Sequence, residues 1–208
     1  MFKDRSDAGR KLAEALFVYK DKKVLVLALP RGGVPVGYEI ARALRCPLDT
    51  IVARKVGAPD NPEYAVGAIA PGLPGEESVL VIDEPVVGIE SVIAEETKEM
   101  ERRMEKYKSG SYAGNVKPET IIIVDDGVAT GKTALAAIRS ALAANPKAKV
   151  IFAAPVGAPD AVARITQEAD KVICLETPEE FMAVGEWYGS FPQLSDEAVI
   201  WYLEKVSA

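Results

Sequence analysis

Apolar and polar residues follow one another along this chain with two different periods, which predict strands and helices in turn. Continuous apolar runs are typical of strands covered on both faces, and they occur at 24–29, 50–53, 120–124, 149–154 and 171–175. Apolar residues at helical spacing predict helices at 4–19, 35–44, 89–108, 132–144 and 159–168. Strands that take turns with helices in this way predict an α/β fold with a central, mostly parallel sheet flanked by helices.

The stretch after the second predicted strand has a different pattern. Gly and Pro are frequent at 56–62, and this composition predicts a loop. Apolar segments at 66–70 and 78–82 flank a second cluster of Gly and Pro. Two apolar segments around such a cluster predict a hairpin or a pair of edge strands.

The composition is that of an ordinary globular chain. It has 208 residues, 49% of them hydrophobic, and a formal net charge of −6, which predicts a single domain over 1–208. We expect a core at about 20–176, with a small hood made by 177–208 and the first helix. The apolar runs are too short to span a bilayer and the first residues hold no apolar signal-peptide core, so we expect a cytoplasmic protein. A net acidic chain is a poor candidate for binding nucleic acid.

The absence of histidine excludes several kinds of chemistry. Ser-His-Asp hydrolysis, Cys-His proteolysis and His-ligated zinc all need an imidazole, and the chain has none. The two cysteines, Cys46 and Cys174, are far apart and form no metal or redox motif. We expect reduced, buried thiols, with a long-range disulfide as the open alternative.

Residues 121–133 combine the groups that would bind a phosphorylated sugar. A buried strand ends in Asp125 and Asp126, and a short turn then leads into a helix that begins near Lys132. The backbone N–H groups at a helix N-terminus bind phosphate, and ligands of such sheets lie beyond the carboxyl ends of the strands. We therefore expect a phosphate on the helix start and a diol on the two carboxylates.

A nucleotide-binding P-loop is an alternative interpretation of the same residues. That motif needs four residues between its first Gly and Gly-Lys-Thr, whereas only three separate Gly127 from Gly131. The two acids would also stand beside a polyphosphate without a cation of their own. The spacing disfavours this interpretation.

The segment resembles the phosphoribosyl diphosphate motif of the type I phosphoribosyltransferase family. In that family two adjacent acids hold the ribose hydroxyls, and the turn after them holds the 5′-phosphate. The resemblance implies a ribose site at Asp125 and Asp126 and a 5′-phosphate site at Ala129, Thr130, Gly131, Lys132 and Thr133. Gly127 departs from the family pattern, which usually has an aliphatic residue there.

Two further segments agree with the order of the family's motifs. Arg31, Gly32 and Gly33 resemble the loop that binds pyrophosphate, where small residues let the backbone approach an anion closely. Arg54 and Lys55 resemble the start of the mobile catalytic loop, as adenine phosphoribosyltransferases have it. The resemblance implies that these two cations are catalytic, together with the two aspartates of the motif.

The implied activity is transfer of the 5-phosphoribosyl group from phosphoribosyl diphosphate (PRPP) to a nitrogenous base, with release of pyrophosphate. The sugar would pass through an oxocarbenium-like state. Mg²⁺ would be held mainly by PRPP and water, with no direct protein ligand. The resemblance also implies a type I phosphoribosyltransferase-like fold, for which a homodimer is one assembly.

The resemblance leaves the acceptor base open. Ala129 stands where oxopurine-specific members carry an acid, which disfavours hypoxanthine and guanine. The tail has an aromatic stretch that suits stacking on a flat base, and we expect base contacts from Phe181, Trp187 and Tyr188. Packing of these residues on the core is the open alternative.

A second hypothesis has the same fold but no catalytic activity. The chain would then be a non-catalytic regulatory module that senses PRPP or a nucleotide. Release of pyrophosphate in the presence of candidate bases would separate the two hypotheses.

Overall fold

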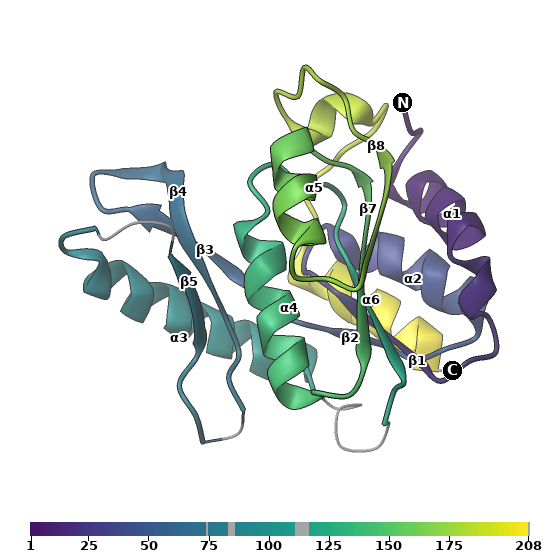
Figure 1. Ribbon diagram of the computed structural model, residues 1–208, viewed down its shortest axis with the longest axis horizontal. Helices are drawn as coiled ribbons and strands as arrows, with labels where there is room; N and C mark the ends of the chain where they lie inside the picture. Colours follow the sequence, from purple (N-terminus) through teal and green to yellow (C-terminus); the bar gives the residue numbers. More distant parts are fainter. Residues whose placement is uncertain (74, 83–85, 111–116, 208) are drawn as a thin grey trace.

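A parallel sheet of five strands forms the centre of the molecule (Figure 1). The computed structural model describes residues 1–73, 75–82, 86–110 and 117–207. The strand order is β2-β1-β6-β7-β8, and every neighbouring pair is parallel. The bounds are β1 Val24–Ala28, β2 Leu48–Thr50, β6 Thr120–Val124, β7 Lys149–Val156 and β8 Lys171–Glu176. The predicted α/β architecture with a parallel sheet is confirmed.

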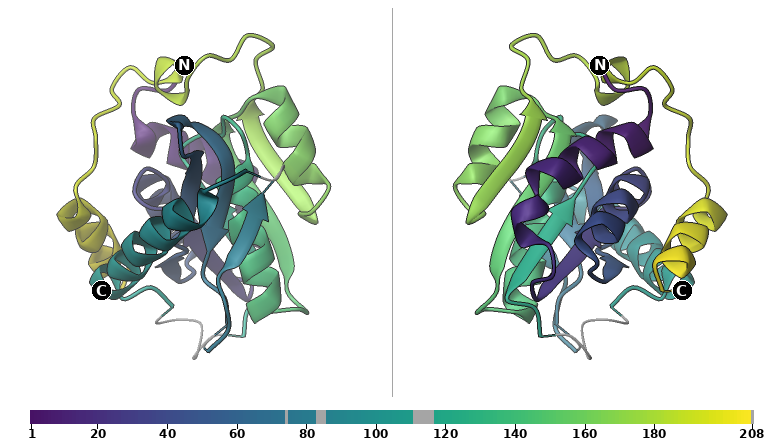
Figure 2. Two further views of the ribbon diagram at one scale, coloured as in Figure 1. Left: turned by 90° about the vertical axis from the view of Figure 1, so that its left-hand side faces the viewer. Right: turned by 90° about the vertical axis from the view of Figure 1, so that its right-hand side faces the viewer.

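Helices cover both faces of this sheet, which explains why its strands are mostly apolar (Figure 2). On β6, Ile122 and Val124 belong to one buried cluster, whereas Ile121 and Ile123 belong to another. The first cluster holds the inner faces of α1 (Arg5–Ala15) and α2 (Gly33–Leu44), and the second holds those of α4 (Lys132–Ala144) and α5 (Pro159–Thr166). Successive side chains of a strand point to opposite faces, so one apolar run serves both layers.

A second sheet of three antiparallel strands stands beside the first (Figure 1). It consists of β3 (Arg54–Ala58), β4 (Asn61–Ala70) and β5 (Val79–Ile82), and α3 (Ile89–Tyr107) packs on it. The predicted hairpin of 66–70 with 78–82 is confirmed, since Gly67 pairs with Ile82.

The loop predicted at 56–62 is wrong, because this stretch contributes to β3 and β4. The register between the two strands shifts on both sides of Gly57, which marks a bulge. A Cβ atom on Gly57 would lie 2.4 Å from the carbonyl oxygen of Pro62. Glycine is thus required here by close approach of the partner strand within a sheet, and its presence does not signal a loop.

The tail after β8 ends in a helix that the sequence prediction missed. After a short 3-10 turn at Val184–Trp187, α6 runs over Asp196–Ser207 and packs on α2 and α3. Its apolar residues Val199, Leu203 and Val206 meet the main buried cluster. Their spacing is helical, so the signal was present in the sequence.

The first helix is shorter than predicted. It ends at Ala15, and a 3-10 turn at Phe17–Tyr19 follows it. Its Leu12 is fully buried in the main cluster beneath the sheet. No helix in the described ranges is both long and apolar enough to cross a membrane.

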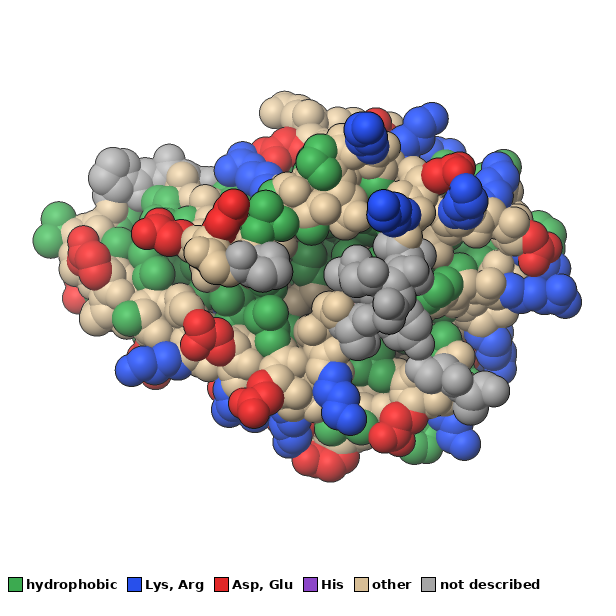
Figure 3. Space-filling view, turned by 90° about the horizontal axis from the view of Figure 1, so that it is seen from below, with side chains coloured by type: hydrophobic (Ala, Val, Ile, Leu, Met, Phe, Trp, Pro, Cys, Tyr) green, Lys and Arg blue, Asp and Glu red, His purple; other side chains and the backbone are tan. Residues whose placement is uncertain are grey.

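An apolar pocket of about 320 Å³ lies between the two sheets, at the C-terminal end of α4. Leu25 and Leu27 of β1 and Pro71 after β4 are among its lining residues. Figure 3 shows hydrophobic side chains gathered on this underside of the molecule. The pocket is far along α4 from the turn that carries the predicted phosphate site.

Candidate active site

The turn after β6 has the geometry that the motif predicts. Strand β6 ends at Val124, and α4 begins at Lys132 after Gly131, whose φ is +80°. Glycine is the residue that adopts this left-handed conformation without strain. The amides in the first turn of a helix have no partner within the helix, so the start of α4 offers N–H donors to an anion.

A pocket of about 450 Å³ opens at this turn. The motif supplies most of its wall, and the β3–β4 hairpin and the tail supply the rest. The motif residues are Asp125, Gly127, Val128, Ala129, Thr130, Gly131, Lys132, Thr133 and Ala134, and the others are Lys55, Glu63, Tyr64, Ala65 and Val184. The pocket therefore brings the acid, the helix start and one of the predicted catalytic cations together.

The two acids of the motif have different surroundings. Asp125 lines the pocket and accepts a 2.8 Å hydrogen bond from the backbone N–H of Asp126. The Asp126 carboxylate instead accepts a 2.7 Å hydrogen bond from Nε of Arg5, and it does not contribute to the wall of the pocket. Burial raises the pKa of Asp125 well above its usual range, and the charge of Asp126 adds to this rise.

The predicted pyrophosphate loop lies directly against the acid pair. A Cβ atom on Gly32 would lie 1.9 Å from Oδ2 of Asp126, and one on Gly33 would lie 2.5 Å from the carbonyl oxygen of Val124. Only glycine permits this approach, so the two glycines hold the loop beside the motif. The Pro30–Arg31 peptide bond is cis, and the Arg31 guanidinium lies 3.8 Å from Asp196 of α6.

The structure separates the two predicted catalytic cations. Lys55 lines the pocket, and its Nζ lies 3.4 Å from Oε2 of Glu63 on the neighbouring strand. Arg54 points to α3, where its Nη2 lies 2.6 Å from Oε2 of Glu96. Alternate residues of a strand point to opposite faces, and this alternation places only Lys55 on the pocket side.

The lysine of the predicted phosphate site contacts the hairpin. Lys132 is 8% exposed, and its Nζ donates a 2.7 Å hydrogen bond to the carbonyl oxygen of Ala65 on β4. Ala129 and Thr130 are exposed at the pocket, and Thr133 is half-buried there. The small and hydroxyl-bearing residues of the turn thus face the opening, while the lysine ties the turn to β4.

Of the three aromatic residues predicted to contact a base, Tyr188 is buried, and Phe181 and Trp187 are partly buried. Tyr188 stacks on Phe191 with ring centroids 4.9 Å apart, and it donates a 2.5 Å hydrogen bond to the carbonyl oxygen of Asp126. Phe181 and Trp187 pack around the same small cluster. The base contact stays a prediction, and packing is the role that the contacts of these side chains support.

Two functional candidates were missed by the sequence prediction. One is Arg5, which holds Asp126, and the other is Val184, which brings the tail into the wall of the pocket. A Cβ atom on Gly127 would lie 2.4 Å from Cγ1 of Val184. The departure of Gly127 from the family pattern therefore has a cause, because the tail's valine occupies the space of the missing side chain.

The donor set suits a cation shared with a ligand better than a protein cage. Among the described residues, no three His, Cys, Asp or Glu side chains gather as a metal site. Asp125 supplies a buried carboxylate oxygen at the pocket, and a nearby positive charge would favour its ionised form. Hard oxygen donors and water are what Mg²⁺ prefers, so the residues present fit Mg²⁺ carried by substrate oxygens.

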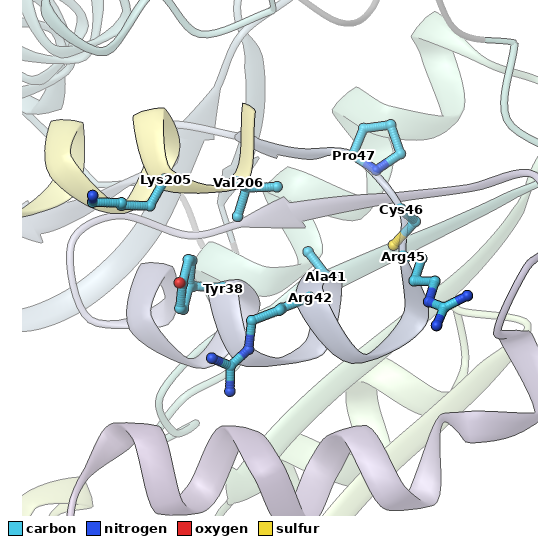
Figure 4. Close-up of a pocket in the computed structure, with 8 residues that line it drawn as sticks. All are labelled: Tyr38, Ala41, Arg42, Arg45, Cys46, Pro47, Lys205 and Val206. Atoms are coloured by element: carbon cyan, nitrogen blue, oxygen red, sulfur yellow. The ribbon is translucent and has the colours of Figure 1, made fainter. Parts of the chain in front are cut away.

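A second pocket of about 450 Å³ lies between α2 and α6, and its charged side chains do not point to a common centre (Figure 4). The charged ends of Arg42, Arg45 and Lys205 point in different directions. Burial raises the pKa of Cys46 there to about 12, so its thiol is protonated at neutral pH. Cys46 and Cys174 are both free, and the alternative of a disulfide between them is wrong.

Comparisons with known proteins match most of the chain. The family model for the phosphoribosyl transferase domain matches residues 3–188. A Mycobacterium tuberculosis protein, named provisionally as a phosphoribosyl transferase, is 43% identical over 213 residues, which cover 99% of this chain and 47% of that protein. The chain therefore spans about half the length of the curated relatives it matches.

Solved structures give the same picture of the fold. The crystal structure of the TT1426 protein from Thermus thermophilus has 38% sequence identity and a TM-score of 0.78, over 98% of each chain. The structure of the AQ2163 protein from Aquifex aeolicus has 12% identity and a TM-score of 0.50, over 83% of this chain and 74% of that one. The second likeness is one of fold alone.

Proposed function

Because this chain belongs to the phosphoribosyl transferase domain family, we propose that it transfers the 5-phosphoribosyl group of PRPP to a nitrogenous base and releases pyrophosphate. The observation that carries this proposal is the pocket after β6, where Asp125 and the start of α4 face the same opening. A carboxylate and a row of amide donors in one pocket suit a sugar diol and its 5′-phosphate.

The residues of the pocket and the loop 31–33, which lies beside the acid pair outside the pocket lining, would divide the substrate among them. The 5′-phosphate would accept hydrogen bonds from the amides of the turn and from the hydroxyls of Thr130 and Thr133. Asp125 would accept hydrogen bonds from the ribose hydroxyls. The pyrophosphate would lie against Gly32 and Gly33, which are close to the acid pair.

Charge on the departing pyrophosphate would be stabilised by cations at the rim. Lys55 lines the pocket, and the side chain of Arg31 on the pyrophosphate loop is 37% exposed. Lys55 can approach a ligand without leaving a buried partner, because its neighbour Glu63 is 94% exposed. Arg31 would move away from Asp196, whose side chain is 12% exposed. Mg²⁺ held mainly by PRPP oxygens and water would neutralise further charge on the leaving group.

Calorimetric titration with PRPP and Mg²⁺ tests the assignment of the site. We expect the wild-type protein to bind and the double variant Asp125→Asn with Asp126→Asn to lose on the order of tenfold or more in affinity, because hydrogen bonds to charged groups are lost. Glu119→Gln is the matched control, since this acid precedes the other end of β6 and is 73% exposed. Equal binding by wild type and double variant, or no binding by either, would contradict the assignment.

One observation favours a sensing role as the second candidate function. Arg54, a predicted catalytic cation, is held by Glu96 on α3 and not at the pocket. A regulatory module would need the ligand contacts but not this cation. Pyrophosphate release measured across a panel of nitrogenous bases separates the candidates, because PRPP binding without release for any base would favour the sensor.

A further inference from the structure

The two acids of the motif are not equivalent in this chain. Asp125 forms part of the pocket wall, whereas Asp126 does not, and the Asp126 side chain is 14% exposed. The carboxylate of Asp126 points to the N-terminal helix and the tail. A ligand in the pocket would meet the first acid directly and the second only through the protein.

Arg5 holds the second acid and also contacts the tail. Nε lies 2.7 Å from Oδ2 of Asp126, and Nη1 donates a 2.8 Å hydrogen bond to the carbonyl oxygen of Pro192. The guanidinium carbon lies 3.8 Å above the centre of the Phe191 ring. Arg5 itself is 9% exposed, so removal of Asp126 from it would leave a buried cation without its carboxylate.

The same carboxylate lies directly against the predicted pyrophosphate loop. The backbone of Gly32 approaches Oδ2 of Asp126 so closely that a Cβ atom there would lie 1.9 Å away. The main chain of Asp126 is fixed as well, since its carbonyl oxygen accepts the hydrogen bond from Tyr188. Arg5, Asp126 and Gly32 thus form a continuous path from the first helix to the loop.

We propose that the acids have separate tasks: Asp125 contacts the ribose, while Asp126, held by Arg5, positions the loop 31–33 that receives pyrophosphate. This inference rests on the proposed function and refines it. Arg5 is a positioning residue and not a catalytic one, because it acts through Asp126. The positive charge of Arg5 also offsets one negative charge of the acid pair, which lowers the repulsion of a polyanionic ligand.

Two ligands separate the tasks, because ribose 5-phosphate lacks the pyrophosphate that PRPP carries. Calorimetric titrations with Mg²⁺ would compare Asp125→Asn, Asp126→Asn and Arg5→Met. We expect Asp125→Asn to lose on the order of tenfold in affinity for both ligands, because it loses a contact to the ribose itself. Asp126→Asn and Arg5→Met should lose a similar factor for PRPP and less than about twofold for ribose 5-phosphate.

The double variant Arg5→Met with Asp126→Asn tests the path between the two residues. It should bind PRPP no more weakly than either single variant, since both remove the same support. Arg10→Met is the control, because Arg10 lies on the same helix with a side chain 52% exposed. Should Arg5→Met fail to fold, the ratio of the two affinities in Asp126→Asn still decides the question.

A loss of ribose 5-phosphate affinity in Asp126→Asn as large as that in Asp125→Asn would overturn the separation of tasks, because Asp126 would then contact the ribose. That result would leave the proposed function standing. A wild-type protein that binds neither ligand would contradict the proposed function itself, and the separation of tasks with it.

Discussion

At the scale of single residues, Lys132 shows how a motif side chain can serve the fold around a site. It lies in the turn predicted to bind the 5′-phosphate, yet its Nζ donates to the carbonyl oxygen of Ala65 on β4. Tyr64 and Glu63, the neighbours of Ala65, line the pocket. The lysine therefore joins the predicted phosphate turn to the hairpin wall.

Replacement of Lys132 by Met should loosen the hairpin at Ala65. The change removes a charged donor from a partly buried carbonyl, which costs about 1.5–3 kcal/mol. Hydrogen exchange of the β4 amides should become faster, while exchange in β7 stays as in the wild type. Lys171→Met, at an exposed position at the start of β8, is the control. Unchanged exchange in β4 would show that this hydrogen bond does not hold the hairpin.

At the scale of elements, the tail after β8 completes the pocket. The 3-10 turn at Val184–Trp187 presses Val184 into the space beside Gly127. The following residues reach Phe2 and Arg5 through Tyr188 and Phe191. The segment that the sequence predicted as a hood thus contacts the motif at Gly127 and at the carbonyl oxygen of Asp126. It also contacts the N-terminal segment at Phe2 and Arg5.

Gly127→Ala should detach this turn from the motif. The new Cβ atom would lie 2.4 Å from Cγ1 of Val184, and overpacking of this kind costs about 1–3 kcal/mol. Limited proteolysis should then cut the chain near 184–187 sooner, and urea denaturation should show the lower stability. The double variant Gly127→Ala with Val184→Ala should recover most of the loss, because the second change restores the space. No recovery would point to a different cause.

At the scale of the whole molecule, a network of charges ties the C-terminal helix to the rest. Asp196 at the start of α6 is 12% exposed. It accepts hydrogen bonds from Tyr107, Lys106 and Arg102 of α3, and it lies 3.8 Å from Arg31 of the predicted pyrophosphate loop. The Tyr107 hydroxyl, with Lys106 and Arg102, holds the pKa of Asp196 well below its usual range.

Stability should therefore fall in acid through this network. A carboxylate whose pKa is lowered on folding stabilises the protein above its unfolded pKa of about 4, and the contribution is lost as the pH falls through the folded value. Glu99 acts in the same sense, because Arg102 and Arg103 lower its pKa to about 2. Between about pH 5 and about pH 2, we expect Asp196→Asn to lose less stability than the wild type.

Urea denaturation at a series of pH values measures this difference. Glu204→Gln is the control, because this acid is exposed on the same helix. The control should follow the wild-type profile. If the free energy of unfolding falls equally with pH in the wild type and in Asp196→Asn, the charges around Asp196 do not cause the loss of stability in acid.

The sequence by itself determined those helices, strands and turns that depend on residues close together in the chain. The apolar run 120–124, the acid pair after it and the helix start at Lys132 are adjacent in the chain, so periodicity and the motif located them correctly. The alternation of strands and helices followed from the same local patterns. The resemblance to a family also rested on these neighbouring residues.

Only the tertiary structure decided how distant segments meet at this site. Arg5 reaches Asp126 across 121 positions, Val184 fills the space beside Gly127, and the stretch around Gly57 becomes a strand because β4 lies against it. Local sequence patterns predict which residues are buried and where turns occur. They do not predict which buried surfaces pack against one another. That choice follows from the packing of the whole chain, and it assigns the two acids, the two cations and the tail their different surroundings.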